Sequence, residues 1–125
     1  MSAERAVDLI TMHFAAPGRG LQPIAVLLLD IDADRLEVRA RPNCRSIAEP
    51  EDARVLEASL FDLAADARQR NGSAILAELE DVLSNSVRLT KRKRLQISDI
   101  QGSLDSLYTQ HVGAYEASES APNDF

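Results

Sequence analysis

The chain has 125 residues and a formal net charge of −6, with 45% hydrophobic and 27% charged residues. Such a length and composition are typical of one folded domain and leave little room for a second. A single cysteine, Cys44, excludes an intramolecular disulfide and a cysteine-rich zinc site. The longest apolar run, residues 24–29, is too short to cross a bilayer, and no secretory signal is visible. We therefore expect a cytoplasmic protein with no membrane partner.

The first segment fits two kinds of element. Ile10, Met12 and Phe14 alternate as in a strand, yet residues 5–15 also place apolar side chains on one helix face. Their β-branched side chains and the proline-glycine break that follows favour a strand. Residues 17–23, with two glycines and two prolines, predict a loop.

The next two segments predict a hairpin. Residues 24–30 are apolar on both faces, which is typical of a strand that is covered on both sides. Residues 36–40 alternate between apolar and charged side chains, as a half-exposed strand does. The aspartate-rich segment between them is the expected turn, so we expect these strands to belong to a three-stranded meander.

Two helices are expected in the middle of the chain. Pro50 suits the first turn of a helix, and Asn71-Gly72 would end it. Ser73 can cap a second helix. The predicted buried stripes are Leu56, Leu60, Leu63 and Ala67 on the first helix, and Leu76, Leu79 and Leu83 on the second.

The last part of the chain predicts another hairpin and another helix. Apolar residues alternate from residue 87 to residue 97, with Lys91-Arg92-Lys93 as the turn. Ser98 and Gln101 match a capping box that opens a helix ended by Gly113. The inward residues of that helix would be Ile100, Leu104 and Leu107, with Tyr108 or His111 beside them.

The resulting fold class is α+β. We expect an antiparallel sheet of two hairpins, with about four to five strands, and three helices packed mainly on one face. Residues 1–115 would form the single domain. Residues 116–125 are polar and acidic, and we expect them to be a flexible tail.

Asp30, Asp32 and Asp34 after an apolar strand are the candidate metal ligands. The favoured interpretation is a structural turn, because aspartate hydrogen-bonds its own backbone and tolerates turn geometry. A divalent-metal site is the alternative, with Glu80 and Asp81 as further oxygen ligands. A calcium loop of the EF-hand type is excluded because its required glycine and glutamate positions hold arginines.

Residues 27–32, Leu-Leu-Leu-Asp-Ile-Asp, resemble the metal-binding strand of diguanylate cyclases. Asp30 and Asp32 also resemble the D-x-D nucleophile motif of haloacid-dehalogenase-like phosphatases. The chain lacks the Gly-Gly-Asp/Glu-Glu-Phe hairpin of the first family, and Asp34 replaces the threonine of the second. The resemblance implies a metal-dependent phosphoryl-transfer enzyme that uses Asp30 and Asp32, which is one alternative function.

Other catalytic patterns are weak. His13 and His111 are the only imidazoles, and neither has a metal-ligand spacing with the other or with Cys44. We interpret Cys44 as a small loop residue and His111 as a residue at the rim of the last helix. The sequence contains no phosphate-binding glycine loop and no glycine-flanked serine elbow. We therefore expect no cofactor, and a protein that is not an enzyme.

Residues 88–95 concentrate positive charge in an acidic chain of pI about 4.8. The five cations are Arg88, Lys91, Arg92, Lys93 and Arg94. On a hairpin tip they would form a basic patch, which Arg39 and Arg41 would extend from the outward face of the first hairpin. The patch can be a solvated turn that prevents edge pairing, a docking surface for a protein, or a nucleic-acid contact. The acidity of the rest and the lack of aromatic residues disfavour nucleic acid.

The favoured function is a non-enzymatic protein-interaction or assembly module of a cytoplasmic complex. The arginine-rich composition suggests a bacterial protein. Docking would use a sheet edge, the basic hairpin tip or the acidic tail, and edge pairing would also permit a homodimer. The first alternative is a nucleic-acid-binding accessory protein that uses the Arg88–Arg94 hairpin, and the second is the metal-dependent enzyme described above.

Overall fold

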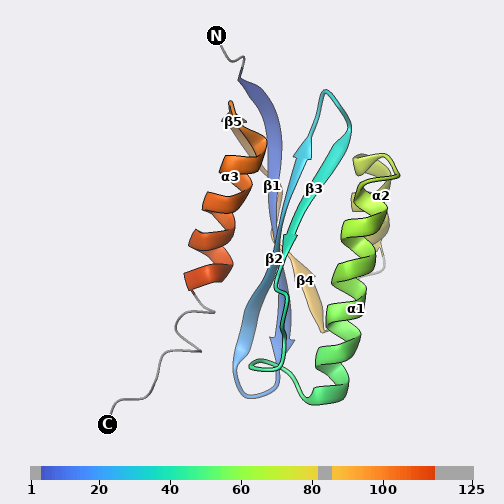
Figure 1. The fold of residues 1–125 in the computed structure, drawn as a ribbon, viewed down its shortest axis with the longest axis vertical. Coiled ribbons are helices and arrows are strands. Elements are labelled where there is room, and N and C mark those ends of the chain that lie inside the picture. Colours follow the sequence, from blue (N-terminus) through green and yellow to red (C-terminus); the bar gives the residue numbers. More distant parts are fainter. Residues whose placement is uncertain (1–3, 82–85, 115–125) are drawn as a thin grey trace.

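The computed structural model describes residues 4–81 and 86–114. Five antiparallel strands form one sheet in the order β3-β2-β1, with β4 and β5 both paired to the other side of β1 (Figure 1). Three helices pack on this sheet. The predicted α+β class and antiparallel sheet are confirmed. None of the described helices is long and apolar enough to cross a membrane.

The sheet is built around a long hairpin of β1 (Arg5–Ala16) and β2 (Gly20–Asp30). The strand interpretation of the first segment is confirmed. The predicted loop is shorter than expected, because residues 20–23 pair with the end of β1. Only residues 17–19 form the turn. Gly18 within the turn and Gly20 directly after it have positive φ angles of 77° and 76°, which glycine adopts readily. β3 (Arg35–Ala40) pairs with β2 and completes the predicted meander.

Helices cover both faces of the sheet. α1 (Pro50–Ala67) and α2 (Gly72–Asp81) pack on one face, together with Leu27 and Leu29 of β2. α3 (Ile100–Tyr108) and the following π-helical turn η1 (Thr109–Gly113) pack on the other, against Val26 and Leu28 (Figure 1). Thus two of the three helices share a face. The third covers the opposite face because β2 is apolar on both sides and needs cover on both.

The prediction of a second hairpin is wrong. β4 (Val87–Leu89) and β5 (Lys93–Ile97) form as strands, but neither pairs with the other. β4 lies along the end of β1, and β5 lies along its beginning. Leu89 opposes Met12 and Lys93 opposes Leu9, so three residues between the strands face two residues of β1. The segment is one edge strand with a β-bulge, because the 12-residue β1 offers a partner for its whole length.

Several helix ends differ from the sequence expectation. α1 ends at Ala67, and Gly72 begins α2 instead of ending α1. Asp99 is the N-cap of α3 and makes no side-chain capping bond, so the predicted Ser98 capping box does not form. The buried stripe of α1 is confirmed in full. Leu83 and the predicted tail at residues 116–125 lie outside the described residues.

Candidate functional site

The first two aspartates of the candidate metal turn do not converge. Asp30 is buried, and its carboxylate accepts a hydrogen bond from Arg5 Nη1 at 2.7 Å and from the Ala33 backbone N–H at 3.3 Å. The carboxylate therefore holds the turn and pairs with β1. Asp32 is exposed at the tip of the same turn. The contacts of Asp30 agree with the interpretation of this segment as a turn.

The third aspartate attaches the turn to α2. Asp34 has a positive φ of 52°, and its carbonyl oxygen accepts the Gly72 N–H at 2.7 Å. Its carboxylate accepts the Ser73 N–H at 2.8 Å and the Ser73 hydroxyl at 3.0 Å. The predicted capping residue of α2 is thus itself bound by an aspartate from a distant turn. These bonds satisfy donors that the first turn of a helix leaves unpaired.

Glu80, one of the two proposed additional metal ligands, is paired with an arginine. Glu80 accepts a hydrogen bond from Arg92 instead of facing the aspartate turn. Within residues 4–81 and 86–114, no group of three or more His, Cys, Asp or Glu side chains could hold a metal ion. Cys44 is fully buried in the core under α1, and its backbone N–H donates to Glu57. Glu57 and Glu80 therefore make contacts that hold segments of the fold together.

The bulge divides the basic run between the two faces of the sheet. Arg94 Nε donates to Asp8 Oδ1 at 2.8 Å, and Arg92 Nη2 donates to Glu80 Oε1 at 2.8 Å. Asp8 and Glu80 belong to the face that α1 and α2 cover. The bond to Glu80 holds the pKa of the Arg92 guanidinium above its ordinary value. Two of the five cations are thus neutralised within the chain.

The two arginines of the first hairpin do not extend a basic patch. Arg41 is 3% exposed, and its Nε donates to the Pro23 carbonyl oxygen at 2.8 Å. Its predicted outward position is wrong, because the side chain is buried and bonded to the backbone of β2. Arg39 binds Asp105 of α3 at 2.7 Å and lies over the Tyr108 ring. Arg39 therefore attaches α3 to the edge of the sheet.

The remaining cations, Arg88, Lys91 and Lys93, belong to the other face. Arg88 opposes His13, and Lys93 opposes Leu9, whose side chain packs with the core under α3. Lys91 and Lys93 line a depression together with both histidines of the chain. His13 and His111 are far apart in the sequence, and the tertiary structure brings them to one site. No spacing rule could have predicted this meeting.

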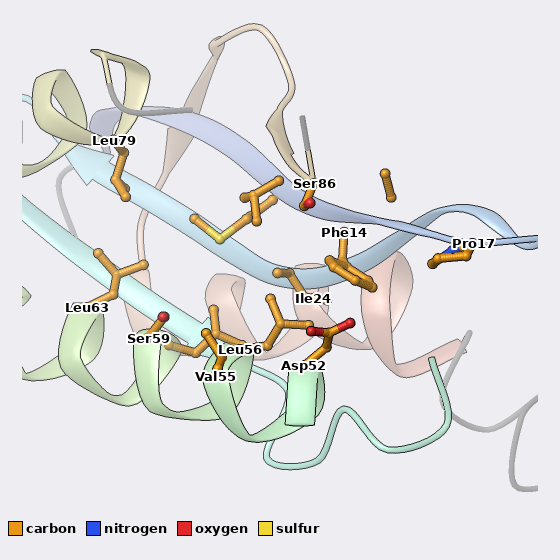
Figure 2. Close-up of a pocket in the computed structure, with 14 residues that line it drawn as sticks. Phe14, Pro17, Ile24, Asp52, Val55, Leu56, Ser59, Leu63, Leu79 and Ser86 are labelled. Atoms are coloured by element: carbon orange, nitrogen blue, oxygen red, sulfur yellow. The ribbon is translucent and has the colours of Figure 1, made fainter. Parts of the chain in front are cut away.

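An apolar groove of about 470 Å³ lies between α1 and the sheet (Figure 2). Figure 2 shows Val55 and Leu56 of α1 facing Phe14 and Ile24 of the sheet, with Leu79 of α2 at one end. Eleven of the fourteen lining residues are apolar. The three polar ones are Asp52, Ser59 and Ser86.

Sequence reasoning missed this groove. The signal was present on α1, because Val55 stands beside the predicted stripe instead of within it. Val55 is 65% exposed. Phe61, also on α1, is 75% exposed. Val55 lines the groove and Phe61 does not, so only the exposed side chain of Val55 contributes to this concave apolar surface.

Searches against protein families, characterised proteins and solved structures find no match to this chain. A functional assignment must therefore come from the groove on one face of the sheet and the depression with two lysines and two histidines on the other.

Proposed function

We propose that the protein is a non-enzymatic interaction module that docks an apolar segment of a protein partner in the groove between α1 and the sheet. The observation that carries this proposal is the composition of the groove, where eleven of fourteen lining residues are apolar. Concave apolar surfaces with a few polar groups are typical binding sites. As the sequence leads us to expect, the assembly would be bacterial and cytoplasmic.

The exposed side chain of Val55 supplies the driving force. Removing apolar surface from water contributes about 25 cal/mol per Å². A partner that covers Val55 and the neighbouring groove gains this term without first unfolding part of the domain. Asp52 and Ser59 lie along the same side of the groove and can orient the partner by hydrogen bonds. Specificity would come from these two side chains.

Two further observations favour docking over the other functions. Arg92 and Arg94 are paired with carboxylates, so at most three cations of the run are left for phosphates. A nucleic-acid complex would then show a log–log salt slope of about −2.7 instead of about −4.5. The Asp30 carboxylate is bonded to Arg5, which disfavours its use as a metal ligand in the alternative of a metal-dependent enzyme. The sheet edges remain secondary docking surfaces, and the bulge shortens the regular part of one edge.

Capture of the tagged full-length chain from its host, with and without nuclease, tests the proposal. Val55→Glu places a charge in the groove, and Ala58→Glu places the same charge on an exposed position of α1 outside it. We expect the captured protein to be lost with Val55→Glu and kept with Ala58→Glu. With the purified partner, Val55→Glu should weaken Kd at least about tenfold.

Two results would count against the groove. Equal capture by both variants would place the contact elsewhere. Loss of the captured material on nuclease treatment would favour the nucleic-acid alternative. If circular dichroism shows that the Val55→Glu variant is unfolded, Val55→Ser replaces it in the experiment. Val55→Ser should also weaken binding of the partner. A homodimer that Val55→Glu dissociates would identify the partner as a second copy of the chain.

A further inference from the structure

A second concave site lies on the opposite face of the sheet from the groove. It is formed where the bulged edge strand approaches η1, and it has a volume of about 450 Å³. β1 contributes Met12 and Phe14 to the groove but Leu9, Thr11 and His13 to this second site. Alternate residues of a strand point to opposite faces, so the two sites are separated by the sheet. We call the second site the basic pocket.

The bulge holds the rim of the basic pocket in place. Thr90 donates its backbone N–H to the Thr11 carbonyl at 3.0 Å, and its hydroxyl oxygen accepts the Thr11 N–H at 2.9 Å. Lys91 follows directly, and Lys93 begins β5. The extra residue of the bulge therefore lies between two segments that are both bonded to β1. Bulges commonly re-aim side chains beside functional sites.

The pocket concentrates cations without their counter-charges. Lys91 and Lys93 are the only lysines of the protein, and both line it. Within the described ranges, neither ammonium group has a carboxylate within salt-bridge distance, whereas the neighbouring Arg92 and Arg94 are both paired. No acidic residue is among the described residues that line the pocket. Lys91 and Lys93 therefore place two unpaired positive charges at the pocket.

Two imidazoles complete the pocket. His13 comes from β1, and His111 comes from η1. Burial and the proximity of His111 lower the pKa of the His13 imidazole, while a hydrogen bond with the Thr11 backbone opposes this. An anion in the pocket would favour the protonated ring and so reverse the lowering. The Gln110 side chain and the Thr90 hydroxyl add neutral polar groups.

We propose that the basic pocket binds the phosphoryl group of a small phosphorylated molecule. Two ammonium groups and two imidazoles match a dianion better than the single charge of a carboxylate. The cations surround a cavity instead of forming a stripe, and the rest of the chain is acidic, which disfavours a long polyanion. Leu9 adds an apolar surface that an organic substituent can cover. The site is independent of the groove and of its partner.

Titration of the full-length protein with two probes, inorganic phosphate and phenyl phosphate, tests the proposal. In low-salt buffer, calorimetry should give one saturable site with a Kd below about 1 mM. NMR should show the imidazole signals of His13 and His111 moving together as phosphate is added. Tighter binding of phenyl phosphate identifies an ester as the ligand. Equal binding identifies the free ion, and either result supports the site.

Variants locate the site. Lys91→Gln combined with Lys93→Gln should weaken phosphate binding at least about tenfold, because each removes a charged donor. Both side chains are exposed and unpaired in the described structure, so the fold should persist. Arg92→Gln removes one charge from the same segment on the opposite face, and its binding should stay within about twofold of the unmodified chain.

Three outcomes would overturn the proposal. The first is no saturable binding of either probe up to about 10 mM. The second is an equal loss of binding in Arg92→Gln, which would indicate diffuse attraction by net charge. The third is an oligonucleotide that binds with a steep salt dependence and is not displaced by phenyl phosphate, which would assign the lysines to nucleic acid.

Discussion

Asp34 shows at the scale of one residue how a turn and a helix depend on each other. Its left-handed backbone conformation suits aspartate better than most residues. The same conformation directs its carbonyl and its carboxylate to the first turn of α2, where three hydrogen bonds form. The carboxylate that the sequence offered as a metal ligand is therefore a helix cap supplied from another part of the chain.

Asp34→Ala should destabilise the protein by about 1–2 kcal/mol, since two side-chain bonds to Ser73 are lost and alanine disfavours a positive φ. Asp34→Asn keeps an oxygen acceptor and the tolerance for this conformation, so it should cost less. Urea denaturation measures the loss of stability of both variants as a shift of the denaturation midpoint at an unchanged m value. Asp32→Ala, at the exposed tip, is the control, and a loss equal to that of Asp34→Ala would remove the capping role.

At the scale of the element, α2 begins so close to β3 that the first residue of the helix must be a glycine. A Cβ added to Gly72 would lie 2.6 Å from the Leu36 backbone nitrogen and 2.8 Å from the Arg35 carbonyl carbon. The glycine is therefore required by proximity to β3, since its φ is not in the left-handed region. The sequence interpretation of Gly72 as a helix terminator identified an important residue for the wrong reason.

Gly72→Ala and Gly102→Ala form a matched pair. The first should cost more than about 2 kcal/mol, because backbone atoms of β3 would have to move. At Gly102, in the first turn of α3, the added methyl group meets only the tip of the flexible Asp99 side chain. Alanine is favoured in helices by up to about 1 kcal/mol, so Gly102→Ala should be neutral or stabilising. Thermal unfolding compares the stability of the two variants. A larger loss in Gly102→Ala than in Gly72→Ala would contradict this packing of α2.

At the scale of the whole molecule, one sheet supports two cores of unequal size. The larger lies under α1 and α2, and the smaller lies under α3 and η1. The smaller core consists of Val7, Leu9, Val26, Leu28, Leu104 and Val112. It also forms the wall between the sheet and the end of the chain that carries His111. Stability of this core therefore determines whether the basic pocket exists.

Leu104→Ala should destabilise the protein by about 2–5 kcal/mol, because the leucine is 3% exposed at the centre of the smaller core. Such a loss is a large part of the total stability of a domain of this size, about 5–15 kcal/mol. Leu107→Ala, at a half-buried position of the same helix, should cost clearly less. Denaturant titration compares them, and a cost near zero for Leu104→Ala would mean that α3 is not packed on the sheet.

The sequence alone determined the elements whose patterns are local. The apolar stripe of α1, the strand at residues 24–30 with two buried faces and the aspartate turn after it were all predicted correctly. Each depends on a periodicity or a turn preference that acts within a few residues. The five cations at residues 88–95 were also found, although their roles were not.

Only the tertiary structure decided how these elements combine. An alternating pattern states which side chains share a face, but not which strand lies beside them, so the sequence could not show that β4 and β5 both pair with β1. That pairing separated Arg92 and Arg94, which bind Glu80 and Asp8 respectively, from Lys91 and Lys93. The groove and the basic pocket arise in the same way, because a site made from distant segments depends on interactions across the chain, which no local pattern encodes.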